Sequence, residues 1–273
     1  MVIISFKHRF IFIKPTKVAG TSLEVALSRF CGKDDVMSRF REEESNQLRA
    51  RFYPYPVRNT IELVKHGEKC TSKLVVHGSV HQLRSFLGND VFRRFLKISV
   101  IRNPYDWVVS LYAWRAHKRR CGPSRETSVS LFRRWFLENI EDELYRQERR
   151  YATLKHPYDA VDFMIRFEHF EEDLTALSQR LGLTENIYDT FKGIREKGHV
   201  RPQSLTTRAC FEGFFEGIEM MKKHYAIELE RFGYDLPWLP ESLSGGLPES
   251  LPGGLSGLSV PTETPQEMMR ENV

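Results

Sequence analysis

Short runs of apolar residues alternate along the first 236 residues with longer stretches in which apolar side chains recur at helical spacing. Runs rich in β-branched and aromatic residues predict buried strands, because such side chains pack well on both faces of a covered sheet. Four segments fit this description: 9–14 (RFIFIK), 73–77 (KLVVH), 97–101 (KISVI) and 160–167 (AVDFMIRF).

The amphipathic stretches predict helices, and several carry start or stop signals. Gly32 and Gly88 lie just beyond two of them, and Asn103-Pro104 is typical of a helix start. Strands that alternate with helices predict an α/β fold, in which helices flank a central parallel sheet. The predicted helices span 21–30, 79–87, 105–118, 125–150, 170–181 and 211–232. The segment 33–72 is polar and mixed, and it contains a helix-like stretch at 41–51 and turns at 53–56.

The composition changes at Pro237. Residues 237–273 contain near-repeats, LPESLSGG and LPESLPGG, and are rich in Pro, Gly, Ser and Leu. A segment of this kind buries too little apolar surface to offset the entropy lost on ordering. We therefore expect one domain over 1–236, followed by a flexible tail over 237–273.

Charge is unevenly distributed between these two parts. The tail carries five Glu and only Arg270, which leaves 40 basic and 31 acidic residues in 1–236, or +9 of formal charge. A basic body suits an anionic ligand such as a nucleotide, a sulfated or phosphorylated small molecule, or a nucleic acid, although a solvated basic surface has the same composition.

Four scattered cysteines, without a CxxC pair, support neither a disulfide framework nor a zinc site, and they favour a reducing compartment. The apolar runs near the N-terminus are broken by Lys7, His8 and Arg9, and the chain holds no apolar stretch of membrane-spanning length. We therefore expect a soluble, cytoplasmic protein without membrane insertion.

Candidate chemistry begins directly after the first predicted strand. The segment KPTKVAGTS brings Lys17 before Gly20, Thr21 and Ser22, at the start of a helix. Free amides and the dipole at a helix start attract anions, Gly20 permits close backbone approach, and the hydroxyls can donate hydrogen bonds. A capped helix start with a surface lysine is the alternative. A Walker A loop is excluded, because Lys17 precedes Gly20 by three positions instead of following a glycine.

A second candidate follows the strand at 97–101, in the segment RNPYDWVVSLYAW. Arg102 stands at the strand end, where ligands bind in open parallel sheets, and Ser110 lies about two helical turns further on. Both can contact a phosphate group. The alternative is that Arg102 pairs with Asp106 and that Ser110 is a buried helix residue.

Together the two segments resemble those of sulfotransferases that use 3′-phosphoadenosine 5′-phosphosulfate (PAPS), and the KxxGTS form is similar to carbohydrate and bacterial members of that family. VHGSVHQLRSFLG, IRFEHFEEDLTALSQRLGL and ERFGYDL extend the resemblance over most of 1–236, although Thr16 stands where the family often has Pro. The resemblance implies a P-loop-NTPase-like, three-layer fold. It also implies PAPS as donor, with Lys17, Val18, Ala19, Gly20, Thr21 and Ser22 on the sulfate side and Arg102 and Ser110 on the 3′-phosphate.

The same resemblance places Lys197 and Arg201 in a loop over the nucleotide, where a solvated loop is the alternative. Transfer of a sulfuryl group requires charge stabilisation on the leaving 5′-phosphate, for which Lys17 is the candidate, and it requires no metal. A hydroxyl acceptor also needs a general base. His77, at the end of the strand 73–77, is the first candidate, His81 is the second, and Glu24 is a weaker third.

Two other classes of function remain open on the sequence. A nucleotide-dependent phosphotransferase is weakened by the missing Walker lysine. A non-catalytic nucleotide- or nucleic-acid-binding module would use the basic run 115–120, but no stacking aromatic platform accompanies that run, so we expect no nucleic-acid partner. The acceptor, a hydroxyl or less readily an amine of a glycan or small molecule, is not specified, because the segments expected to bind it, 33–72 and 119–160, carry no motif. The oligomeric state is open.

Overall fold

Five strands form the central sheet of the protein, in the order β3-β1-β2-β6-β7. The computed structural model describes residues 2–65, 68–73, 80–118, 128–151, 161–194, 200–236 and 238. Strand β2 is parallel to β6, and β6 is parallel to β7, whereas β1 is antiparallel to both β2 and β3. The bounds are β1 Val2–Ser5, β2 Phe10–Ile13, β3 Val36–Met37, β6 Leu96–Ile101 and β7 Phe163–Arg166.

The parallel part of this sheet confirms the predicted α/β fold, while its antiparallel edge was not predicted. Strands β2, β6 and β7 fall within the runs 9–14, 97–101 and 160–167. Strand β1 reverses into β2 through a tight turn in which Arg9 has a φ of 53°. The polar residues Lys7 and His8 that interrupt the apolar pattern therefore form the turn of a hairpin.

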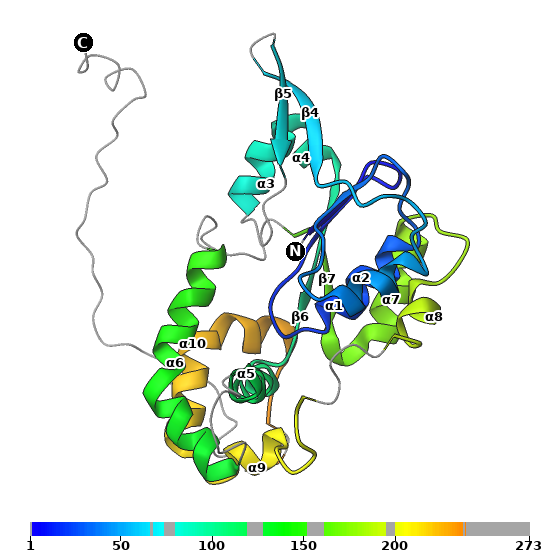
Figure 1. Cartoon of the computed structure of the whole chain (residues 1–273). Helices are drawn as coiled ribbons and strands as arrows, with labels where there is room; N and C mark the ends of the chain where they lie inside the picture. Colours follow the sequence, from blue (N-terminus) through cyan, green and yellow to red (C-terminus); the bar gives the residue numbers. More distant parts are fainter. Residues whose placement is uncertain are drawn as a thin grey trace, which may run out of the picture. The chain divides into compact units, whose positions relative to one another are not determined.

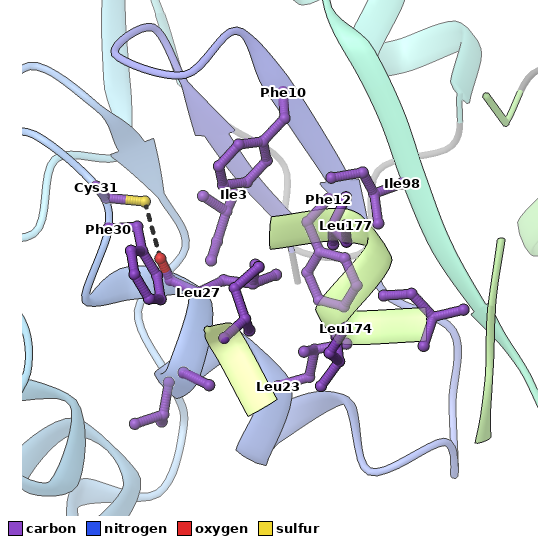
Figure 2. Close-up of a cluster of buried hydrophobic side chains, with 14 of the residues drawn as sticks. Ile3, Phe10, Phe12, Leu23, Leu27, Phe30, Cys31, Ile98, Leu174 and Leu177 are labelled. Atoms are coloured by element: carbon purple, nitrogen blue, oxygen red, sulfur yellow. Dashed lines mark hydrogen bonds between the residues drawn. The ribbon is translucent and has the colours of Figure 1, made fainter. Parts of the chain in front are cut away.

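Helices cover both faces of the sheet and give it three layers (Figure 1). Successive residues of β1 and β2 point to opposite faces, as strand geometry requires. Figure 2 shows Ile3, Phe10 and Phe12 packed on one face against Leu23 and Leu177, which come from helices α1 (Gly20–Ser28) and α7 (Phe170–Arg180). On the other face, Ile4, Ile11 and Ile13 pack with apolar residues of α3 (Val80–Leu87) and α4 (Asn89–Arg94). Burial on both faces explains why these runs are almost entirely apolar.

The segment 60–73 forms an antiparallel hairpin, which the sequence did not predict. Its strands are β4 (Thr60–Lys65) and β5 (Glu68–Lys73). The second strand reads EKCTSK and has no apolar run, so the hydrophobic pattern did not predict it. The strand predicted at 73–77 is described only at Lys73, where β5 ends, and residues 74–77 lie outside the described part of the chain.

A second group of helices packs around aromatic side chains. Tyr105, Tyr112, Phe132, Phe136 and Phe211 contact one another edge to face or tilted. They come from α5 (Pro104–Lys118), α6 (Val129–Tyr151) and α9 (Thr207–Phe211), beside α10 (Phe215–Phe232). This packing fixes α5 at the carboxyl end of β6.

The helix predicted at 211–232 corresponds to α10, which begins later, at Phe215, while Phe211 is the last residue of the separate helix α9. Gly213 lies between them with a φ of 71°, which is the left-handed conformation that ends a helix. The other predicted helices are present with shifted ends. The remaining elements are α2 Glu43–Ala50, the 3-10 turn η2 Phe167–His169 and α8 Ile187–Phe191.

The tail predicted at 237–273 lies outside the described residues except for Trp238. Among the residues that are described, no helix combines the length and the apolar character needed to cross a bilayer. The thiols of Cys31 and Cys210 are free and buried.

Candidate functional site

The loop between β2 and α1 has an unusual backbone. Lys17 and Ala19 have positive φ angles, 62° and 52°, and Val18 between them does not. A left-handed conformation costs energy for a residue with a Cβ and persists only where the surroundings hold it. Backbone that alternates in this way turns successive N–H groups toward one side and makes a concavity for an anion. We refer to this loop, residues 14–19, as the anion loop, because the sequence predicts an anion site here.

Contacts from β6 and α5 hold this loop in place. The Arg102 guanidinium donates from Nη1 to the carbonyl oxygen of Lys17 at 2.8 Å. The Trp107 indole donates from Nε1 to the carbonyl oxygen of Thr16 at 3.1 Å. Arg102 directly follows β6, the strand that pairs with β2. The parallel pairing of β2 and β6 therefore brings the two predicted motifs together.

Helix α1 begins directly after the loop. Its first backbone hydrogen bond runs from the Leu23 amide to the Ala19 carbonyl oxygen, so Gly20, Thr21 and Ser22 form the first turn. Amides of a first turn have no partner inside the helix, and the helix dipole adds positive potential there. A Cβ on Gly20 would lie 2.6 Å from Cγ of Lys14, so glycine lets the Lys14 side chain cross the helix start.

The ammonium group of Lys17 lies against α5. Its Nζ is 4.6 Å from the centre of the Trp114 ring, and Lys118 contacts the same ring at 5.0 Å. Attraction between a cation and an aromatic face holds such a group with modest strength. The Lys17 ammonium therefore lies at the edge of the loop, against the Trp114 ring of α5.

Arg102, Asp106 and Arg201 form a charge cluster beside the loop. Arg102 donates from Nε to Asp106 Oδ2 at 2.6 Å, while Oδ1 accepts from Arg201 and, at 2.6 Å, from the Thr207 hydroxyl. Burial alone would raise the pKa of Asp106, but the charge of Arg102 and the hydrogen bonds from Thr207 and Arg201 outweigh it and lower the pKa to about 2. Asp106 is therefore ionised at neutral pH, and the cluster of two guanidinium groups and one carboxylate keeps one net positive charge.

Ser110 lies on the face of α5 that carries these contacts. Asp106, Ser110 and Trp114 are spaced by four residues, so they lie along one side of the helix. Asp106 binds Arg102, and Trp114 contacts Lys17, which places Ser110 between the two ends of the site. Within the described part of the chain the half-buried Ser110 hydroxyl has no hydrogen-bond partner. Arg102 pairs with Asp106, as the alternative expected, and it also contacts the loop through the Lys17 carbonyl oxygen, while its contact with a phosphate group stays a prediction.

The RFE segment fixes the carboxyl end of the sheet. Arg166 pairs with Asp173 at 2.8 Å. Glu168 accepts from the backbone amide of Asn103 at 2.7 Å and from the Tyr234 hydroxyl at 3.0 Å. Glu168 therefore ties the residue after Arg102 to the segment that follows α10.

The sequence did not predict the buried charges beneath the loop. Lys14 and Arg49 each pair with one oxygen of Glu24, at 3.1 and 3.0 Å. The Glu24 and Arg49 side chains are almost completely buried. Both carboxylate oxygens of Glu24 are thus engaged with cations, which makes Glu24 a poor general base. A lysine directly after a strand and a glutamate in the facing helix were the only signals for this cluster.

Three of the predicted site residues cannot be placed in this geometry. His77 and Lys197 lie outside the described residues, and His81 lies in the first turn of α3 with an undescribed side chain. Arg201 is described, and its contact with Asp106 brings it to the same cluster as Arg102. In the described ranges no group of three His, Cys, Asp or Glu side chains is arranged to hold a metal ion.

Comparison with known proteins agrees with this arrangement. The model of the sulfotransferase family matches residues 1–235, which is nearly all of the predicted domain. Searches of curated proteins and of solved structures gave no match. The family match spans the anion loop, the Arg102 segment and the closing helix, and a match of this extent shows the family. The chain is a member of the sulfotransferase family, whose enzymes transfer sulfuryl groups.

Proposed function

We propose that the protein transfers the sulfuryl group of PAPS to a hydroxyl group, less readily an amine, of a glycan or small molecule. The observation that carries this proposal is the 2.8 Å hydrogen bond from Arg102 to the Lys17 carbonyl oxygen. It joins the two segments in which the sequence predicts anion-binding residues. A donor with anionic groups on both its 5′ and 3′ positions suits such a site better than a nucleotide with a single phosphate chain.

Each part has its own chemistry. The loop offers backbone N–H groups, the Lys17 ammonium and the hydroxyls of Thr21 and Ser22, which suit the 5′-phosphosulfate. The other part offers Arg102, Ser110 and Arg201, which suit the 3′-phosphate. Lys197 belongs to the same proposal as a further phosphate contact.

The transfer is an in-line displacement. The acceptor oxygen forms a bond to sulfur while the bond from sulfur to the 5′-phosphate oxygen breaks, and the electron pair of that bond stays on the phosphate. Lys17 meets the charge that develops there, because its ammonium lies at the loop and a preorganised cation acts most strongly on charge that grows in the transition state. His77 takes the proton of the acceptor hydroxyl, with His81 as the second candidate.

A transfer assay tests this proposal. The protein is incubated with PAPS carrying labelled sulfur, or with ATP carrying a labelled γ-phosphate, and with a panel of hydroxylated metabolites and glycans. We expect label from PAPS to appear on at least one acceptor and no transfer from ATP. Transfer from ATP, with none from PAPS, would assign the protein to the phosphotransferases instead.

Two variants show whether any transfer belongs to the proposed site. Lys17→Ala should abolish most of it. Lys192→Met changes an exposed lysine that pairs with Asp189, and it should leave transfer unchanged. Equal loss of transfer in both variants would show that the assay reports a general effect of removing a lysine.

A further inference from the structure

A second lysine, Lys14, lies at the anion loop. It follows the last residue of β2, and its side chain crosses Gly20 so closely that a Cβ there would lie 2.8 Å from Cε. Its Nζ ends 3.0 Å from the hydroxyl oxygen of Thr21 and 3.1 Å from Glu24 Oε2. Only 8% of the side chain is exposed. The ammonium therefore lies under the first turn of α1 and not in solvent.

The contact with Thr21 has only one possible direction. An ammonium group is a donor and never an acceptor, so Lys14 donates and the Thr21 oxygen accepts. The hydroxyl hydrogen of Thr21 must then point elsewhere. In the part of the chain that the structure describes it has no acceptor. Thr21 thus has an unused donor at the turn where the anion is expected to bind.

Buried charges around Lys14 keep it in this position. Glu24 accepts from Lys14 on one oxygen and from Arg49 on the other, and these three groups together carry one net positive charge. The Phe40 ring lies beneath both cations, with the Arg49 guanidinium 3.7 Å from the ring centre. A buried ionic cluster contributes little net stability, because desolvation offsets most of the attraction. A role at the site explains its presence better than stability does.

We infer that Lys14 is a positioning residue for the donor, because it forces the Thr21 hydroxyl to donate toward the 5′-anion. The inference rests on the proposed function, since it assigns the same loop to the 5′ end of the nucleotide. Lys14 acts through Thr21, so removing either side chain should remove the same interaction.

A double-mutant cycle tests this coupling in the full-length protein. Calorimetry gives the Kd of adenosine 3′,5′-bisphosphate and of adenosine 3′-monophosphate. The Kd of the monophosphate divided by the Kd of the bisphosphate is the ratio that isolates the contribution of the 5′-phosphate. The variants are Lys14→Met, Thr21→Val and the double variant. Lys192→Met, another lysine paired with a carboxylate, is the matched control. Thermal unfolding checks that each variant folds, and Lys14→Leu, which also lacks a donor, replaces Lys14→Met if the latter does not.

Loss of a hydrogen bond to a charged group commonly weakens binding by about tenfold or more. We expect Lys14→Met and Thr21→Val each to lower the ratio by about tenfold, and the double variant to lower it no further. The inference is wrong if the Lys14 variant keeps the wild-type ratio within about twofold, or if the two effects multiply. Failure of the wild-type protein to bind either nucleotide would instead overturn the proposed function, so the two failures are distinguishable.

Discussion

Asp106 offers a sharp test of the charge cluster beside the loop. Its carboxylate accepts hydrogen bonds from Arg102, Arg201 and Thr207, and these contacts depend on its being ionised. Asp106→Asn keeps the size of the side chain and removes the charge. The two guanidinium groups then repel each other without a carboxylate between them. We therefore predict that the variant folds with reduced stability and that the reduction depends on pH.

The lowered pKa of Asp106 gives the size of this loss of stability. The pKa of Asp106 falls from an ordinary 3.8 to about 2 on folding, and each unit corresponds to about 1.4 kcal/mol. The ionised carboxylate thus stabilises the folded state by about 2 kcal/mol. Because the folded-state pKa is the lower one, this contribution is complete above about pH 4 and is lost as the pH falls through about 2. At pH 3, about half of it remains.

Urea denaturation of the wild type and of Asp106→Asn at pH 7, 4 and 3 measures this difference. We expect Asp106→Asn to lower the free energy of unfolding by about 2 kcal/mol at pH 7 and 4, and by about 1 kcal/mol at pH 3. Asp189→Asn removes an exposed carboxylate that also pairs with a cation, and it should show no such pH dependence. The reasoning would be refuted if Asp106→Asn had the same free energy of unfolding as the wild type at pH 7, or if the difference between them stayed constant from pH 7 to pH 3.

Four further predictions concern turnover and packing. Lys17→Ala should lower the initial rate with every acceptor by about 10²–10³-fold while the melting temperature stays unchanged. His77→Ala should lower turnover by about 10²–10⁴-fold and leave nucleotide affinity intact. The loss of turnover should be smaller for acidic phenols, which need less help to lose a proton. Near-normal turnover with an alcohol acceptor would show that His77 is not the base, and His81 would be tested next. Gly20→Ala places a methyl group 2.6 Å from Lys14 Cγ and should lower the free energy of unfolding by about 1–3 kcal/mol, as measured by denaturation. Gly193→Ala should cause no such loss, because its methyl group would lie 3.7 Å from the Thr190 carbonyl oxygen. Deleting 239–273 should leave melting temperature and turnover nearly unchanged; a large fall in either would show that the tail packs on the domain.

The parts of the fold that the sequence predicted are those whose burial leaves a simple pattern. Strands β2 and β6 are buried on both faces, so most of their residues are apolar. Strand β5 is polar along its length and pairs with β4 in a separate two-stranded sheet, so its sequence shows no hydrophobic pattern that would predict a strand. The break between α9 and α10 depends on the left-handed backbone of Gly213, and a glycine within a helical pattern does not reveal its φ angle.

Some residues of the candidate site were likewise predicted from the sequence, and others were not. Lys17 and Arg102 were predicted because each follows a strand of a parallel pair, and the ends of such strands lie side by side. Trp114 and Arg49 were not identified. Their roles depend on contacts with Lys17 and Glu24, which are distant in the sequence, and periodicity does not encode such contacts. Asp106 was considered only as a local partner of Arg102, so its contact with Arg201 emerged from the fold.

The central claim is that the anion loop and Arg102 form a single site for a nucleotide with 5′- and 3′-anions. Calorimetric titration with adenosine 3′,5′-bisphosphate, adenosine 5′-monophosphate and ATP tests it most directly, in the wild type and in Arg102→Met. We predict that the wild type binds the bisphosphate much more tightly than the other two nucleotides. In Arg102→Met the affinity for the bisphosphate should fall to about that of the 5′-monophosphate. Equal affinities for the bisphosphate and the 5′-monophosphate in the wild type would contradict the claim.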